Sequence, residues 1–207
     1  MSPINRHLKP LMRQIATRDV IEIIGPGDLE TAGALAYIAE CYGFRYAGVR
    51  RVGQYKVLHI QLIRDTSTAA QQRAAANLAA FPDPGKGRPV PGMYLGSLTP
   101  VPETQAEVDL LTTLIRYDLV LAVGNRKQLL TITWGSAALF LLMAPLTGQY
   151  AILLPLAVLL PAFLLVALRV NAAKRAKLAQ RLTAAGCTPV QDEAGRERYV
   201  RPVPDAA

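Results

Sequence analysis

Few residues in this sequence have the types and spacing that catalysis or metal binding would need. The only histidines, His7 and His59, stand 52 positions apart, and the only cysteines are Cys41 and Cys187. A metal ion usually requires several His, Cys or carboxylate ligands at close spacing, and a nucleophilic thiol requires a base beside it. The sequence therefore predicts no metal site, no cofactor and no catalytic residue, and we expect Cys41 to pack in a core.

Two glycine-containing segments could bind phosphate, because backbone amides at a helix N-terminus attract anions. Gly25 and Gly27 precede a predicted helix, but Asp28 would place a negative charge where the phosphate would lie. The spacing of a dinucleotide-binding or P-loop motif is absent. The Gly85–Arg88 segment has the composition of a flexible basic loop. We interpret both segments as turns without a ligand.

A basic patch is predicted around one β-turn. The formal net charge of the chain is +8 at pH 7, which is typical of proteins that bind nucleic acid or anionic surfaces. The residues of this patch are Arg50, Arg51, Lys56 and His59. The paired strands lack the aromatic signature of RNA-recognition domains, so the sequence disfavours nucleic acid. We expect the patch to meet lipid headgroups, an acidic protein or a small anionic ligand.

The patch would lie on a small cytosolic α+β domain that covers residues 1–103. Alternating and β-branched residues predict strands at Asp19–Gly25, Phe44–Val52, Tyr55–Arg64 and Met93–Leu98, with a two-residue turn at Gly53 and Gln54. Helical spacing predicts helices over Asn5–Thr17, from Asp28 to Gly43 and over Thr66–Ala80. After the first helix the order is β-α-β-β-α-β, the ferredoxin-like plan with both helices on one face of a four-stranded sheet. Without the last strand, an open β-α-β-β-α unit would remain.

The strongest pattern is a run of 41 residues, Gln128–Leu168, that contains no Asp, Glu, Lys or Arg. About 20 apolar residues in a helix cross the roughly 30 Å hydrocarbon layer of a bilayer, so this run is long enough for two crossings. Turn-forming residues in Pro145–Tyr150 would separate them. We expect a transmembrane hairpin over residues 128–169, with helices at about 129–144 and 150–168. The rest of this chain is too small to cover such a hairpin as a buried core.

Charges on either side of the hairpin predict its orientation. Basic residues remain on the cytoplasmic side of a membrane, and the turn between the predicted spans carries no charge. We expect a hairpin in the inner membrane with both termini in the cytoplasm, and a composition rich in Ala, Arg and Pro indicates a bacterial source. The expected headgroup anchors are Arg126, Lys127, Arg169, Lys174, Arg175 and Lys177.

Two further segments would flank the hairpin. Residues 104–127 predict an amphipathic connector helix that lies on the membrane surface or continues into the first span. Residues 170–207 predict a basic helix over Asn171–Ala185, a small β-hairpin over Thr188–Val200 and a frayed tail. We expect both segments on the cytoplasmic side.

The predicted spans contain no ionisable residue, which disfavours a proton or ion pathway. Thr131, Gly135 and Ala138 form a stripe of small residues that would permit close packing against other helices. We expect a non-catalytic subunit of a multi-protein bacterial inner-membrane assembly, bound to lipids and to other membrane subunits or a second copy of itself. The alternative is a ligand-gated membrane effector or pore whose cytosolic domain senses a small ligand. An enzyme comes third, because no nucleophile, acid–base pair or metal site can be recognised.

Overall fold

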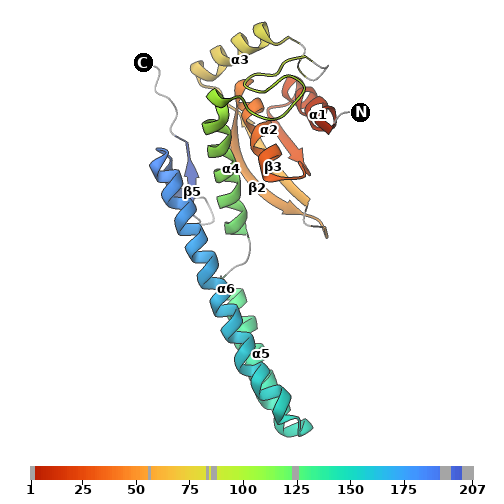
Figure 1. The fold of residues 1–207 in the computed structure, drawn as a ribbon, viewed down its shortest axis with the longest axis vertical. Helices are drawn as coiled ribbons and strands as arrows, with labels where there is room; N and C mark the ends of the chain where they lie inside the picture. The colour runs from red at the N-terminus through yellow and green to blue at the C-terminus, as the bar shows by residue number, and fades with distance from the viewer. Residues whose placement is uncertain are drawn as a thin grey trace. The chain divides into compact units, whose positions relative to one another are not determined.

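A computed structural model describes residues 3–55, 57–82, 84, 88–122, 126–191 and 197–201, with the backbone alone for residues 3–5, 122 and 126–130. The fold is mixed α+β with small antiparallel sheets (Figure 1). The chain divides into two compact units. Unit 1 comprises Met1–Leu119 and Arg181–Ala207, and unit 2 comprises Val120–Gln180. Unit 2 is therefore an insertion between two segments of the chain that fold together.

A three-stranded antiparallel sheet lies at the centre of unit 1, in the order β1-β3-β2. Its strands are β1 (Val20–Ile24), β2 (Phe44–Val52) and β3 (Val57–Arg64). The side chains of Ile21, Ile60 and Leu62 are fully buried, so these alternate residues define the core face. The β2–β3 turn is longer than the predicted two residues, because the register pairs Val52 with Val57.

Most of the other buried side chains of unit 1 lie on helices. The helices are α1 (Pro3–Thr17), α2 (Leu29–Cys41), α3 (Thr68–Ala80) and α4 (Pro102–Ala122). The Asp28 side chain accepts a hydrogen bond of 2.6 Å from the Thr31 amide and so caps α2. A Cβ at Gly33 of α2 would overlap the Thr112 hydroxyl of α4. This glycine therefore allows the two helices to approach closely.

The predicted fourth strand is wrong. Residues 93–98 are all described and form no strand, and Met93 makes a single isolated bridge with Pro100. A fourth strand of a ferredoxin-like sheet would pair with the outer edge of β1. At that edge, the Gln14 amide of α1 donates to the Glu22 carbonyl at 3.1 Å, and its oxygen accepts from the Glu22 amide at 3.0 Å. The ferredoxin-like domain is therefore not confirmed, and the strands and helices from β1 to α3 have the open β-α-β-β-α order.

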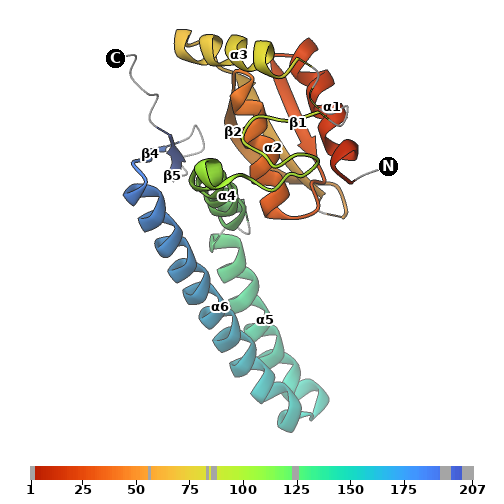
Figure 2. The same ribbon diagram turned by 45° about the horizontal axis from the view of Figure 1, so that its top comes forward.

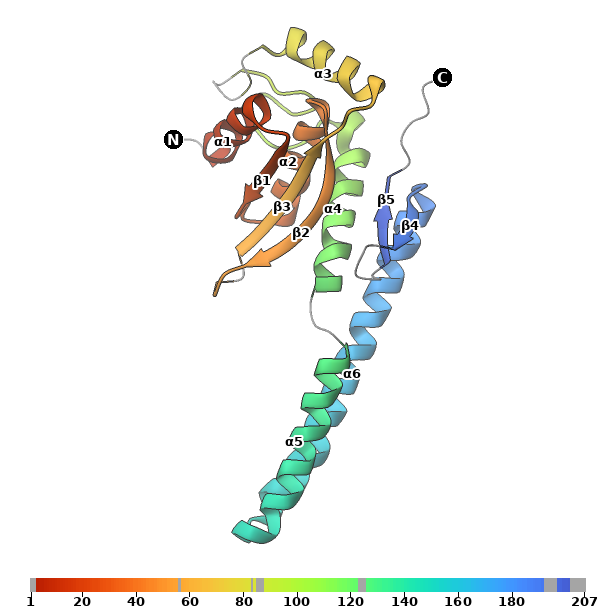
Figure 3. The same cartoon turned by 180° about the vertical axis from the view of Figure 1, so that it is seen from behind.

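Unit 2 contains α5 (Arg126–Thr147) and most of α6 (Tyr150–Ala184). Gly148, with φ of 69°, lies in the short turn between them, where the sequence predicts a break. The two helices lie side by side in all three views (Figures 1, 2 and 3). The predicted basic helix over Asn171–Ala185 is present up to Ala184, but it is the continuation of α6 rather than a helix of its own.

One helix in the described part of the chain, α6, is long and apolar enough to cross a membrane. Within α5 the described apolar stretch is Thr131–Thr147, which is shorter. Only 11% of the most apolar window of α6 is buried. The apolar surface of α6 is therefore largely uncovered by the protein itself.

The chain returns to unit 1 after α6 as a two-stranded antiparallel sheet. Its strands are β4 (Thr188–Gln191) and β5 (Glu197–Val200). The two strands occur where the sequence predicts a hairpin, and residues 192–196 between them lie outside the described residues.

Candidate functional site

Three segments of unit 1 meet at the Arg198 side chain of β5. Its Nη2 lies 3.1 Å from Oδ2 of Asp118 on α4 and also donates to the Ala47 carbonyl of β2. The Asp118 carboxylate in turn accepts a 2.8 Å hydrogen bond from the Tyr46 hydroxyl. The side chain of Asp118 is only 10% exposed, whereas that of Arg198 is 32% exposed, so the carboxylate lies largely away from water.

An irregularity in β2 creates the space for this guanidinium. The β2–β3 register shifts between Tyr46 and Gly48, so the intervening Ala47 has no pairing partner in β3. A Cβ at Gly48 would lie 2.7 Å from Nη2 of Arg198. Burial and the Asp118 carboxylate raise the pKa of Tyr46 well above its usual value, so its hydroxyl remains a donor.

A second arginine, Arg201, follows β5 and joins α2 to α4. Its Nη1 lies 3.0 Å from Oε2 of Glu40, and its Nη2 lies 3.6 Å from Oε2 of Glu107. Between the two arginines, the Tyr199 ring packs edge-to-face against Tyr117 at 5.0 Å. We call Arg198, Tyr199, Arg201 and their partners the C-terminal clamp. Nothing in the spacing of these residues along the sequence indicates their partners, which lie up to 161 positions away.

Because Arg201 pairs with Glu40 in the C-terminal clamp, we expect the Arg201→Gln variant to lose stability to an extent that depends on pH. Burial raises the pKa of Glu40, and Arg201 opposes this effect. Without Arg201 the pKa of Glu40 in the folded chain should rise further above its value in the unfolded chain. Between these two pKa values, the folded state keeps a proton on Glu40 that the unfolded state has released. Stability should then fall as the pH rises from the unfolded pKa through the folded one. We expect a loss of about 2 kcal/mol at pH 8 and less at pH 5.

Thermal unfolding followed by near-ultraviolet circular dichroism of the tyrosines would measure this difference. The matched control is Arg201→Gln combined with Glu40→Gln, which removes the titrating group and should remove the difference between the two pH values. An equal loss at both pH values in the single variant would contradict the assigned role of Glu40.

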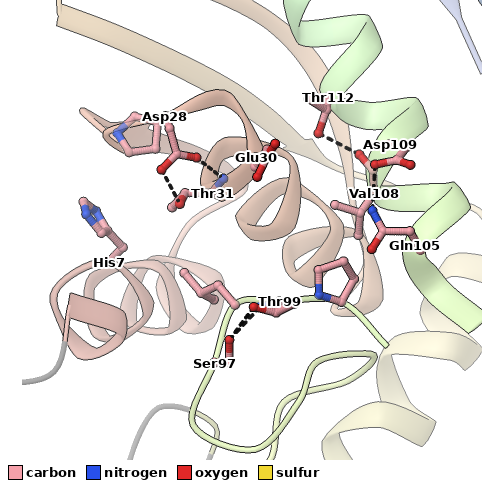
Figure 4. A pocket seen from close by; sticks show the side chains of 13 residues that line it. His7, Asp28, Glu30, Thr31, Ser97, Thr99, Gln105, Val108, Asp109 and Thr112 are labelled. Atoms are coloured by element: carbon pink, nitrogen blue, oxygen red, sulfur yellow. Dashed lines mark hydrogen bonds between the residues drawn. The ribbon is translucent and has the colours of Figure 1, made fainter. Parts of the chain in front are cut away.

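A cavity of about 460 Å³ lies in another part of unit 1, between α1, the start of α2, the loop before α4 and α4 itself (Figure 4). Its polar lining includes His7, Asp28, Glu30, Thr31, Ser97, Thr99, Gln105 and Asp109. Several of these groups bind one another: Gln105 donates to Asp109 at 2.8 Å, and the Ser97 hydroxyl donates to that of Thr99 at 2.7 Å. The carboxylates make the cavity suited to a cation rather than to an anion.

The predicted basic patch is dispersed over the sheet. Arg50 pairs in register with His59, so both lie on the face opposite the core, whereas the neighbouring Arg51 lies on the core side of β2. Arg50 Nη2 lies 2.6 Å from Oε1 of Glu22, which neutralises its charge. His59 Nδ1 lies 3.5 Å from Oε2 of Glu22, beyond an ordinary hydrogen bond. Lys56 lies outside the described residues.

The predicted small-residue stripe and anchors lie in unit 2 or at its ends. Gly135 and Ala138 are exposed, and a Cβ at Gly135 would meet no atom within 4 Å. The buried small residues of α5 are instead Thr133, Ala137 and Ala144. The predicted anchors Arg169, Lys174, Arg175 and Lys177 are all exposed on α6. The side chains of Arg126 and Lys127 lie outside the described residues.

Both cysteines are expected to be unreactive in the folded chain. Cys41 and Cys187 are 7% and 3% exposed, and burial raises the pKa of Cys41 to about 11 and that of Cys187 in the same direction. Because the thiolate is the reactive form, maleimide labelling should be at least about 100-fold slower than in denaturant. Labelling followed by intact-mass measurement would show this, and rapid modification of either thiol in the native chain would contradict it.

In the described residues, no three His, Cys, Asp or Glu side chains come together in a way that could hold a metal ion. Comparison with protein-family models, with curated proteins and with solved structures finds no match to this chain. The functional assignment therefore depends on the geometry described above.

Proposed function

We propose that this protein is a membrane-embedded, non-catalytic subunit of a larger assembly. In this proposal α5 and α6 cross the bilayer and pack against other membrane helices, and unit 1 docks partners at the cytoplasmic surface. The observation that carries the proposal is the apolar surface of the two helices, which the protein leaves uncovered.

Exposed apolar side chains follow both helices along their length. On α5, Leu139, Leu142 and Leu146 are exposed, and on α6, Val158, Leu159 and Phe163 are exposed. Soluble monomers rarely expose apolar patches of more than a few hundred Å². A core helix of a soluble protein would be mostly buried, whereas the most apolar window of α6 is 11% buried. Lipid is the solvent that suits such a surface.

The division of the chain supports two crossings. Leu119 and Arg181, on either side of the insertion, belong to the same compact unit, so an insertion that enters a bilayer must leave it on the same side. The number of crossings is then even. The apolar stretch of α5, Thr131–Thr147, lies at the short end of the about 17–25 residues that cross a bilayer, and α6 would supply the other crossing.

Charge supports the cytoplasmic side for unit 1. Arg169, Lys174, Arg175 and Lys177 follow the apolar part of α6 and are exposed, as residues at a cytoplasmic headgroup layer would be. The proposal therefore includes the inner membrane of a bacterium, with both termini cytoplasmic.

The exposed small residues of the predicted α5 stripe support packing against other membrane helices. Because Thr133 and Ala137 are the buried small residues, the exposed Gly135 and Ala138 are available for a helix from another chain. Small residues permit the close backbone approach that membrane helix pairs use.

Cross-linking in native membranes, followed by detergent solubilisation of the tagged chain, would test the assembly. We expect a discrete complex that Gly135→Leu weakens and that Leu142→Ile, a matched exposed substitution on α5, leaves intact. Recovery of a lone monomer from both native and variant membranes would contradict the proposal.

The cavity in unit 1 favours a second candidate, a ligand-gated membrane effector. In this alternative a small ligand bound in the cavity would change how the apolar helices associate, and the carboxylates favour a cationic ligand. Overexpression with and without candidate amines separates the two functions, since an effector should make cells leak when its ligand is supplied and a scaffold should not.

A further inference from the structure

We propose that the β2–β3 turn of unit 1 docks on the anionic surface of the bilayer, with Tyr55 in the headgroup layer and Arg51 beside lipid phosphates. This inference rests on the proposed membrane insertion of α5 and α6. It adds a second, reversible contact between unit 1 and the membrane.

The turn exposes an aromatic and aliphatic surface that nothing else in unit 1 requires. Tyr55 is 89% exposed, and Val52 and Val57, which flank the turn, are 39% and 36% exposed. On the adjacent end of β1, Ile24 is 54% exposed. Tyrosine with neighbouring aliphatic residues is typical of protein surfaces that lie at the membrane interface, because the ring is apolar and its hydroxyl is polar.

The charge of the turn complements an anionic surface. Residues 50–57 include Arg50, Arg51 and Lys56 and contain no Asp or Glu. Arg50 is paired with Glu22, but its side chain is still 60% exposed. Arg51 is exposed and has no ion pair with any described residue. A basic residue close to an anionic membrane contributes about 1 kcal/mol to binding.

The placement of the turn within unit 1 makes this contact geometrically reasonable. Figures 1 and 3 show the β2–β3 turn at the same end of unit 1 as the C-terminal end of α4. The chain continues from that end of α4 into the apolar insertion, since unit 2 begins at Val120. An insertion held in a bilayer would bring this end of unit 1 close to the headgroups.

Single-stranded RNA fits the same turn less well. Proteins that bind RNA bases usually stack them on several aromatic side chains. Tyr46, the other tyrosine of this hairpin, donates its hydroxyl to Asp118 and is therefore not available for stacking. Tyr55 alone, with aliphatic neighbours, suits lipid better than bases.

An environment-sensitive dye next to Tyr55 would test the proposal. Gln54 is exposed, so Gln54→Cys can carry a nitrobenzoxadiazole dye while Tyr55 stays intact and the buried native cysteines remain unlabelled. The full chain would be reconstituted in nanodiscs of phosphatidylcholine with or without phosphatidylglycerol. Leu95→Cys, at a position that is 72% exposed in the loop before α4, provides the reference label.

We expect the dye at position 54 to shift to the blue in anionic nanodiscs and to be quenched by spin-labelled lipid, and the reference dye to remain in water. Arg51→Glu and Tyr55→Ser should each reduce the quenching at least about twofold. Arg45→Glu, a matched change at the other end of β2, should not.

Two results would overturn the docking proposal: equal emission and quenching at both dye positions, or a blue shift that appears only when RNA or an acidic peptide is added. Failure of the full chain to enter nanodiscs would instead contradict the proposed function. The two proposals therefore fail in different ways.

Discussion

Under the proposed membrane insertion, removing Val120–Gln180 and joining Leu119 to Arg181 through a flexible linker is expected to give a protein that leaves the membrane fraction and remains folded in aqueous buffer. The reason is that both junction residues belong to unit 1, whereas the exposed apolar side chains of α5 and α6 lie in the removed segment. A linker of about 12 Gly and Ser residues has a mean reach of about 19 Å. Fractionation after alkaline extraction of membranes would measure the change.

The control for this deletion keeps the insertion and removes residues 192–207 instead. That variant should stay in the membrane pellet, because its apolar helices are intact. Release of the full chain by alkaline extraction, or retention of the deletion variant in the pellet, would show that unit 2 is not the membrane anchor.

Arg198→Met is expected to destabilise unit 1 by about 3 kcal/mol, which lowers the melting temperature by about 9 °C in a domain of this size. The variant would leave the largely buried carboxylate of Asp118 without a cation and the Ala47 carbonyl without this donor. Breaking one partner of a buried ion pair costs more than the pair itself contributes. A thiol-reactive dye that detects exposure of Cys41 during heating would report unfolding of unit 1.

A double-mutant cycle would test whether loss of the Arg198–Asp118 ion pair causes this destabilisation. Asp118→Asn removes the buried charge, so Arg198→Met should cost about 1–2 kcal/mol less in that background. Arg50→Met, which breaks an exposed ion pair with Glu22, is the matched control and should cost less than about 1 kcal/mol. Equal costs for Arg198→Met in both backgrounds would contradict coupling between Arg198 and Asp118.

Local signals in the sequence predict most elements of this fold. The β-branched residues of β1 and β3 predict two of the strands, and Asp28 predicts the start of α2. The uncharged run predicts the two apolar helices, and Gly148 predicts the break between them. Each of these signals acts over a few residues, so one sequence is enough to predict the type and place of these helices and strands.

The errors concern interactions between distant segments. Met93–Leu98 has the composition of a strand, but the Gln14 side chain already satisfies the Glu22 amide and carbonyl at the β1 edge. Periodicity could not reveal this competition. The C-terminal clamp was missed for the same reason, because Arg198 and Arg201 find their acidic partners only after the chain has returned from unit 2.

The candidate site residues also show that sequence spacing does not reveal how side chains are placed relative to distant segments. Arg50 and Arg51 are neighbours in sequence, yet strand alternation places them on opposite faces of the sheet, and Glu22 neutralises one of them. In α5 the buried small residues are Thr133, Ala137 and Ala144, whereas Gly135 and Ala138 of the predicted stripe are exposed. Sequence spacing identifies which residues share a helical stripe but not which stripe meets the neighbouring helix.

The sidedness of the α5–α6 turn tests membrane insertion most directly. Single cysteines at Gln149 in this turn and at Leu95 in unit 1 would be treated with a membrane-impermeant maleimide in intact and in lysed cells. We predict that Gln149→Cys reacts from outside the intact inner membrane and that Leu95→Cys reacts only after lysis. Reaction of both positions from the same side would contradict two crossings of the bilayer.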